Sequence, residues 1–171
     1  ELTTEVLEDP KLLPQESKIL RNNGEVHFED VSESAGAFFH KTLVTRGLAT
    51  ADYDQDGKMD IAVILHSGKA TLLKNTSKDT GNYLRVKLSG TKTNRFGIGA
   101  RIQVKTSVNT YTHESVLSSS YLSTNSTIAH FGLGDASAVE SVIVTWPNGN
   151  KTTVESPAIN SLLTVEENDS E

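Results

Sequence analysis

The fold of this chain is decided by one stretch of sequence, Asp52-Tyr53-Asp54-Gln55-Asp56-Gly57-Lys58-Met59-Asp60, with the apolar run Ile61-Ala62-Val63-Ile64-Leu65 directly after it. Three of the five apolar residues are β-branched, and the run is short. Both properties predict a buried β-strand. The acidic residues before this run are predicted to form the loop that leads into the strand.

The acidic loop has the spacing of a calcium site. Carboxylates occupy loop positions 1, 3, 5 and 9, and Gly57 stands at position 6, where a sharp turn is needed. Carboxylates about 4 Å apart repel by about 4 kcal/mol per pair at an effective dielectric of about 20, so we expect a cation among them. A cage of oxygen atoms suits Ca²⁺ better than Mg²⁺, which demands a tighter octahedron. The predicted Ca²⁺ ligands are the side chains of Asp52, Asp54, Asp56 and Asp60 and the backbone carbonyl of Lys58.

The loop differs from an EF-hand. Position 12 would be Val63, which lacks the bidentate carboxylate, and a strand rather than a helix is predicted to follow. The alternative is a solvated acidic turn that binds nothing. Four aspartates in phase with a glycine favour the metal site over that alternative.

The remainder of the sequence predicts an all-β protein. Short β-branched runs alternate with Gly, Asn, Asp and Ser. Asn22-Asn23-Gly24 and Trp146-Pro147-Asn148-Gly149 predict hairpin turns, and residues 1–16 predict a loop with a turn of helix. The predicted strands are Lys18–Arg21, Glu25–Asp30, Gly47–Ala51, Ile61–Leu65, Ala70–Lys74, Tyr83–Leu88, Ala100–Thr106, Tyr111–Val116, Thr127–Phe131, Val139–Trp146, Lys151–Val154 and Ser161–Val165.

Composition excludes several classes of function. The chain has 171 residues, a net charge of −6 and no cysteine. Disulfides, thiolate zinc sites, iron–sulfur clusters and a cysteine nucleophile are therefore excluded. Negative charge makes nucleic acid and anionic membranes poor partners. The longest apolar run, Ile61–Leu65, is far shorter than the ~20 residues of a membrane span.

The first half of the chain resembles FG-GAP repeats, the blades of integrin-α-type β-propellers. The acidic loop with its following strand is similar to their calcium loop. The flanking pieces that agree are Leu20-Arg21-Asn22-Asn23-Gly24, Phe28-Glu29-Asp30-Val31, Ser34-Ala35-Gly36 and Arg46-Gly47-Leu48-Ala49. Gly24-Glu25-Val26 stands where Gly-Asp-Gly is usual, so we expect no second calcium loop there.

The second half resembles the ASPIC and UnbV domain, which follows such blades in cartilage acidic protein and bacterial secreted proteins. Together the two resemblances imply an extracellular, calcium-binding and non-catalytic protein. The matching residues are Leu88-Ser89-Gly90, Asn94-Arg95-Phe96-Gly97-Ile98-Gly99-Ala100-Arg101, Ser120-Tyr121-Leu122-Ser123, His130-Phe131-Gly132-Leu133-Gly134 and Val144-Thr145-Trp146-Pro147-Asn148-Gly149.

We therefore expect an incomplete propeller-type blade with a calcium loop, followed by an antiparallel β-sandwich of about seven strands. The expected blade, with its N-terminal segment, covers residues 1–76, and a linker covers residues 77–81. The sandwich then covers residues 82–166, and an acidic tail covers residues 167–171. One blade cannot close a propeller, so we expect its exposed surface to bind a protein partner or a second copy.

The functional expectation is a secreted or cell-surface module for adhesion or assembly, in which Ca²⁺ rigidifies the 52–60 loop. One alternative is a carbohydrate-binding module that uses Trp146, Tyr121, Tyr111 and Tyr83, although packing in the core is favoured for these residues. A hydrolase is a third hypothesis, and it could draw on the stretches 113–114 and 118–120. A single strand would place His113 and Glu114 on opposite faces, so we expect no catalytic residues.

Overall fold

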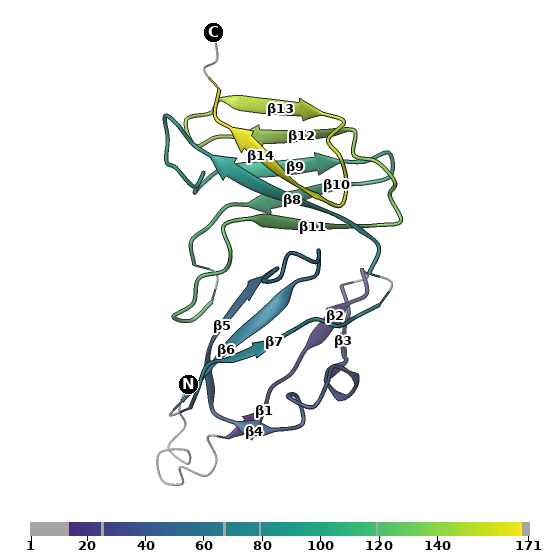
Figure 1. The fold of residues 1–171 in the computed structure, drawn as a ribbon, viewed down its shortest axis with the longest axis vertical. Helices are drawn as coiled ribbons and strands as arrows, with labels where there is room; N and C mark the ends of the chain where they lie inside the picture. Colours follow the sequence, from purple (N-terminus) through teal and green to yellow (C-terminus); the bar gives the residue numbers. More distant parts are fainter. Residues whose placement is uncertain (1–13, 25, 67, 79, 119, 169–171) are drawn as a thin grey trace. The chain divides into compact units, whose positions relative to one another are not determined.

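The computed structural model describes residues 14–168 except residues 25, 67, 79 and 119. It is an all-β structure in which the described residues form no α-helix, and η2 (Ser32–Ser34) is a short 3₁₀ turn (Figure 1). The described part contains no helix of the length and apolar character that a membrane crossing requires. The chain divides into two compact units. Among the described residues, one unit contains those up to Leu48 together with Ala62–Leu73, and the other contains Ala49–Ile61 and those from Lys74 onward.

The first unit contains two short antiparallel pairs. Strand β2 (Leu20–Asn22) pairs with β3 (Phe28–Asp30), which confirms the predicted hairpin. Its turn has the expected chemistry, because the side chain of Asn22 accepts a 2.8 Å hydrogen bond from the N–H of Gly24, whose φ is +88°. Strand β1 (Gln15–Glu16) pairs with β4 (Thr42–Leu43), which corrects the loop predicted for residues 15 and 16. The predicted turn of helix falls on residues 1–13, which lie outside the described residues.

The acidic loop connects two strands of a three-stranded sheet. These strands are β5 (Thr45–Ala51) and β6 (Asp60–Leu65), and β7 (Thr71–Leu73) lies beside β6 in the order β5-β6-β7. A strand therefore follows the loop, as the apolar run predicted. Val63, which stands at the twelfth position counted from Asp52, is buried in this strand, so the segment differs from an EF-hand.

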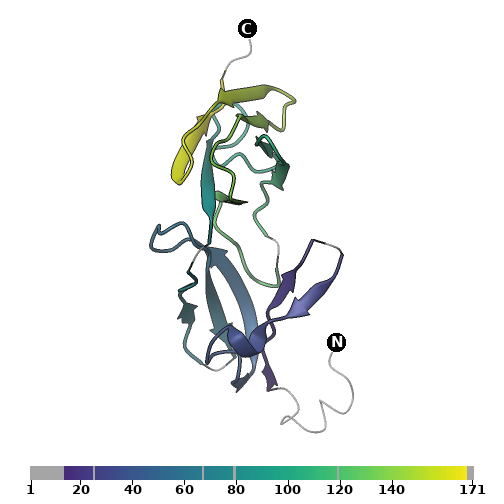
Figure 2. The same cartoon turned by 90° about the vertical axis from the view of Figure 1, so that its right-hand side faces the viewer.

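The second unit contains a sandwich of seven strands in two sheets, which Figures 1 and 2 show as separate layers. The strand orders are β10-β9-β12-β13 and β11-β8-β14. Their bounds are β8 (Asn82–Ser89), β9 (Arg101–Lys105), β10 (Thr110–Glu114), β11 (Ala129–Gly134), β12 (Ser141–Thr145), β13 (Lys151–Glu155) and β14 (Ser161–Glu166). The predicted number of strands is confirmed.

Alternating side chains of the two sheets form the core of the sandwich. In β8 every second residue faces inward, as the period-two pattern predicted. The facing strands β9 and β12 contribute their own alternate residues. The buried cluster consists of Leu84, Val86, Leu88, Ala100, Ile102, Val104, Ala129, Phe131, Leu133, Val139, Val142, Val144, Trp146 and Val165.

One pairing in the sandwich departs from the antiparallel expectation. Strand β14 runs parallel to β8, with Ser161 opposite Leu84 and Glu166 opposite Ser89. Asn160 supports this pairing at the start of β14. Its N–H donates to the carbonyl of Tyr83 (2.7 Å), and its side-chain oxygen accepts from the N–H of Tyr83 (3.0 Å). The chain crosses from one sheet to the other between β13 and β14, and this crossing produces the parallel direction.

The Trp146-Pro147-Asn148-Gly149 turn joins β12 to β13, as predicted. The N–H of Gly149 donates to the carbonyl of Trp146 (2.9 Å), and Gly149 has a φ of +89°. The indole of Trp146 is only 1% exposed, and its N–H donates to the hydroxyl of Thr152 (2.9 Å). Trp146 is therefore a core residue, which is the packing role favoured for it over a sugar-binding one.

Glu167, the first residue of the predicted acidic tail, is buried in the sandwich unit. Its Oε2 accepts hydrogen bonds from the N–H groups of Thr91 (3.0 Å), Lys92 (2.9 Å) and Thr93 (2.9 Å). Its Oε1 accepts one from the side chain of Asn148 (3.0 Å). Burial raises the pKa of Glu167, but the hydrogen bonds from Thr93, Lys92 and Thr91 outweigh it and lower the pKa to about 2. Residues 169–171 of the predicted tail lie outside the described residues.

Candidate metal centre

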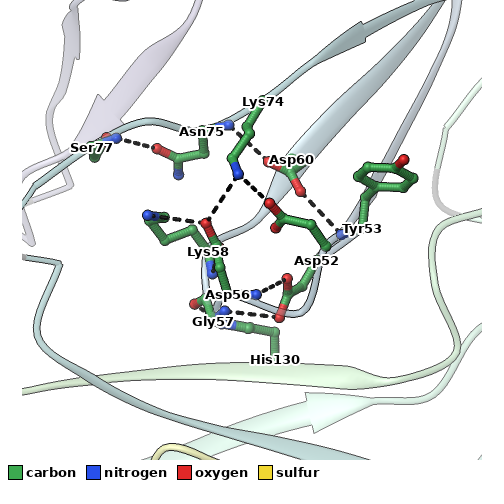
Figure 3. Close-up of polar contacts among 11 residues, drawn as sticks. Asp52, Tyr53, Asp56, Gly57, Lys58, Asp60, Lys74, Asn75, Ser77 and His130 are labelled. Carbon is green, nitrogen blue, oxygen red and sulfur yellow. Dashed lines mark hydrogen bonds and ion pairs between the residues drawn. The ribbon is translucent and has the colours of Figure 1, made fainter.

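Three aspartates of the acidic loop lie together. Asp52, Asp54 and Asp60 each offer one carboxylate oxygen, and these oxygens all lie within 4.8 Å of one another. The loop leaves β5 and enters β6, so the ends of two strands fix where it begins and ends. The whole loop belongs to the same compact unit as the sandwich. Figure 3 shows the polar contacts around it.

Asp52 is held from two directions. Within the loop, the N–H of Asp56 donates to its Oδ1 (3.0 Å), and the N–H of Gly57 donates to its Oδ2 (3.1 Å). From the sandwich, Nη1 of Arg85 on β8 donates to the same Oδ2 (3.0 Å). The side chain of Asp52 is only 4% exposed and that of Arg85 is 10% exposed, so this is a buried ion pair. Nε of Arg85 is buried and has no hydrogen-bond partner.

Asp60 is buried and is held by backbone groups. It is 2% exposed and is the first residue of β6. Its Oδ2 accepts from the N–H of Tyr53 (3.0 Å), and its Oδ1 accepts from the N–H of Asn75 (2.7 Å). Asp60 therefore joins the start of the loop to the segment that follows β7.

Asp56, the fourth predicted carboxylate ligand, does not belong to this group of three carboxylates, and the predicted role of the Lys58 carbonyl stays a prediction. The N–H of Lys58 donates to Oδ1 of Asp56 (3.0 Å), and the ammonium of Lys58 lies 3.1 Å from Oδ2. Desolvation alone raises the pKa of Asp56, but the side-chain and backbone hydrogen bonds from Lys58 lower it overall. The structure thus brings together three of the four predicted carboxylates.

Lys74 supplies positive charge to the cluster from outside the loop. Its ammonium donates to Oδ2 of Asp54 and lies 3.8 Å from Oδ2 of Asp56. The hydrogen bond to Asp54, followed by the charge of that carboxylate, raises the pKa of Lys74. The side chain of Lys74 is 51% exposed, which sets it apart from the buried Arg85.

The opposite side of the loop contacts the sandwich at Gly57. The carbonyl of Gly57 accepts a 2.7 Å hydrogen bond from Nε2 of His130 on β11, so this nitrogen carries the proton. The ring of His130 stacks on that of Tyr83 on β8, with 5.7 Å between the ring centroids. Gly57 has a φ of +85° and lies against Tyr83, where an added Cβ would come within 2.6 Å of the ring atom Cδ1. A glycine is therefore required here by both conformation and space.

A second contact fixes the chain just before the loop. The N–H of Thr50 donates to the side-chain oxygen of Asn125 (2.9 Å), and the carbonyl of Thr50 accepts from the N–H of Ser126 (3.1 Å). The loop is thus attached to β8, to β11 and to the segment before β11.

Residues 90–171 match the family model ASPIC and UnbV. The match confirms the resemblance expected for the second half of the chain. The ASPIC and UnbV region contains β9 to β14, and it supplies His130, Asn125 and Ser126 to the loop contacts. Strand β8, with Tyr83 and Arg85, precedes the matched region. A search of curated proteins found no significant match to the chain.

The donors suit a hard divalent cation. All three cluster residues are carboxylates, and carboxylate oxygen is the ligand that such ions prefer. Ca²⁺–oxygen distances of about 2.3–2.6 Å place opposite ligands about 4.6–5.2 Å apart, which is compatible with oxygens within 4.8 Å of one another. These three residues could therefore share one metal ion.

The sequence did not indicate three of the residues that contact the loop. The alternation of apolar and charged residues in β8 predicted that Arg85 lies on the outer face of a half-buried strand. Lys74 ended a predicted strand. His130 was predicted to lie partly buried at a strand end, and the structure places it half-buried on β11. The sequence signal for these contacts was a charged residue, Arg85, on the face of β8 opposite the apolar one. This signal did not indicate which residue Arg85 would bind.

Of the other residues considered for chemistry, Tyr111, His113 and Ser118 have structural contacts, and residue 119 lies outside the described residues. Tyr111 packs against the core, whereas Tyr121 is exposed on a loop. The ring of His113 meets Phe131 edge-on, at 6.2 Å between centroids, and burial lowers its pKa. The hydroxyl of Ser118 donates to backbone carbonyls of its own loop.

Proposed function

We propose that this chain is a non-catalytic, extracellular calcium-binding module for adhesion or protein assembly, in which Ca²⁺ rigidifies the 52–60 loop. The observation that carries the proposal is the meeting of the Asp52, Asp54 and Asp60 carboxylates in a loop attached to the sandwich. The resemblance of this loop to FG-GAP repeats supports calcium and an extracellular location.

The role of the ion follows from charge. Three carboxylates in close contact repel one another, and a divalent cation converts this repulsion into attraction. Asp52, Asp54 and Asp60 would bind it directly. Asp56 and the carbonyl of Lys58 would complete the set after Asp56 leaves its lysine partners. Asp52 and Gly57 already attach the loop to β8 and β11. The ion would fix the remaining carboxylate, that of Asp54, and would leave the loop little conformational freedom.

Exposed apolar side chains support a protein partner. Leu48 on β5, Ile64 on β6 and Leu72 on β7 are all exposed to solvent. Phe28 on β3 is also exposed. Surfaces that bind another protein or a second copy typically expose apolar residues, and we place the partner on the strands that carry these side chains.

The test is a calcium titration followed by thermal melting and light scattering. Wild type should melt at a higher temperature in millimolar Ca²⁺ than in EDTA. Asp54→Asn should lose most of this difference and melt nearly as wild type does in EDTA, because the Asp54–Lys74 pair is partly exposed and contributes about 0–1 kcal/mol.

Asp135→Asn is the matched control, since it removes the same charge at an exposed site outside the loop. It should keep the full calcium response. An equal loss for Asp54→Asn in Ca²⁺ and in EDTA would contradict the proposed role. Light scattering in the same samples reports whether Ca²⁺ changes the assembly state.

A further inference from the structure

The four aspartates of the loop are neutralised in different ways. Asp52 pairs with buried Arg85, and Asp60 accepts two backbone N–H groups. Asp56 pairs with Lys58 at 3.1 Å. Asp54 pairs with Lys74. Four negative side chains thus meet three positive ones, and each positive charge comes from a different part of the chain.

Lys74 is the cation that can leave most easily. Its side chain is half exposed, so its ammonium can move into water without a desolvation penalty. Arg85 is buried, and separating it from Asp52 would leave an uncompensated charge in the interior. Lys58 lies next to its partner in the same loop, so it remains nearby even when the pair opens.

The backbone holds Lys74 beside the cluster. The next residue, Asn75, donates its N–H to Asp60 (2.7 Å), and the side chain of Asn75 accepts from the N–H of Ser77 (3.0 Å). Figure 3 shows this segment passing next to the loop, with the side chain of Lys74 directed toward it. The ammonium therefore stays at a high local concentration near Asp54 whenever it is released.

We infer that Lys74 is an internal competitor of the divalent cation, which neutralises Asp54 in the metal-free protein and leaves it when the ion binds. This inference rests on the proposed calcium binding. The ammonium occupies a carboxylate oxygen that the ion needs, so the apparent affinity for Ca²⁺ falls with the fraction of molecules in which Asp54 is free. Lys74 thereby sets the calcium concentration at which the loop is filled.

The experiment compares Lys74→Met with Lys78→Met in the full chain. Met keeps most of the length of lysine and removes the charge. Lys78 is an exposed lysine in the same segment, so its variant controls for the general loss of one positive charge. Isothermal titration with CaCl₂ measures affinity, and thermal melting in EDTA measures the metal-free protein. Lys74→Gln serves as a second variant with a polar side chain.

We expect Lys74→Met to bind Ca²⁺ about two- to sixfold more tightly than wild type, which corresponds to release of Asp54 from a partly exposed pair that is formed about half to five-sixths of the time. In EDTA the same variant should melt below wild type, because Asp54 then lacks its counter-charge. Lys78→Met should match wild type in both measurements.

The outcomes separate this inference from the proposed function. If wild type and Lys74→Met bind Ca²⁺ equally, the inference is wrong and calcium binding stands. If only Lys74→Met binds, the inference holds and wild type is not a calcium protein under these conditions. If neither binds at millimolar Ca²⁺, both are wrong. If Lys78→Met tightens binding as much as Lys74→Met, the effect is general electrostatics and the inference is wrong.

Discussion

Asp52 and Asp54 lie two positions apart and share one cluster, yet their surroundings give them different energetic roles. Asp52 forms a buried pair with Arg85, whereas Asp54 meets the half-exposed Lys74. Removing one member of a buried pair costs about 3–5 kcal/mol, because the other charge stays buried without a partner. An exposed pair contributes about 0–1 kcal/mol. Substitution of Asp54 therefore tests the proposed metal binding with little effect on the fold, whereas substitution of Asp52 affects the fold as well.

The lowered pKa of Glu167 predicts that the stability of the protein depends on pH. Its pKa lies at about 2 in the folded protein and near 4.5 when unfolded, so folding favours the ionised form. The resulting stability is fully present above pH 4.5 and is lost as the pH falls towards 2. Glu167→Gln should lower the free energy of unfolding at pH 7, and its curve should approach that of wild type at low pH.

Denaturant unfolding measured from pH 7 to pH 2.5 tests this prediction. Glu166→Gln, at the exposed neighbouring position, is the control and should follow wild type throughout. A constant difference between Glu167→Gln and wild type over the whole range would show that the carboxylate charge contributes nothing.

At the scale of elements, Gly57 is one of the points at which the loop contacts the sandwich, beside the Asp52–Arg85 pair. We expect Gly57→Ala to lower stability by at least about 1–3 kcal/mol, because alanine disfavours a φ of +85° and its Cβ would overlap the Tyr83 ring. The substitution should also weaken calcium binding, since the loop can no longer lie against β8 and β11.

Gly132→Ala on β11 provides the comparison. The space around Gly132 is open within 4 Å, so its substitution should change stability little. Denaturant unfolding and calcium titration of both variants test the prediction. Equal stability of the two variants would show that the Gly57 contact is unimportant.

The sequence allowed most of the elements to be predicted because they depend on local patterns. Alternation defined β8, Asn-Gly defined the first hairpin, and Trp-Pro-Asn-Gly defined the turn after β12. Partners distant in sequence were not predictable in this way. The Arg85–Asp52 pair joins residues 33 positions apart, and nothing in the alternation of β8 specifies that a loop covers its outer face. The parallel direction of β14 likewise depends on which sheet the chain enters.

At the scale of the whole chain, one compact unit contains Ala49–Ile61 together with the residues from Lys74 onward, and the boundary expected at residues 77–81 stays a prediction. The acidic loop belongs to the same unit as the sandwich, whereas β7 and the part of β6 from Ala62 onward belong to the other unit. Sequence order favoured assigning the loop to the blade. The contacts of Arg85, His130 and Asn125 assign it to the second unit instead.

The binding of calcium should therefore stabilise residues outside the loop as well. We expect hydrogen exchange to slow in residues 52–60 and in the adjoining parts of β8 and β11 when Ca²⁺ is added, because Asp52 and Gly57 bond directly to Arg85 and His130. Residues 20–30 should be unchanged. Exchange mass spectrometry of wild type and Asp54→Asn measures this, and slowing restricted to residues 52–60 would contradict the expected coupling.

The parallel pairing of β14 with β8 also affects how the protein is made. Tyr83 and Asn160, which bond at the start of this pairing, are 77 positions apart. On the ribosome, β8 emerges long before β14 is synthesised, so one of its edges carries free N–H and C=O groups throughout that interval. The nascent chain, rather than the finished protein, is thus the species most exposed to aggregation and to capture by chaperones.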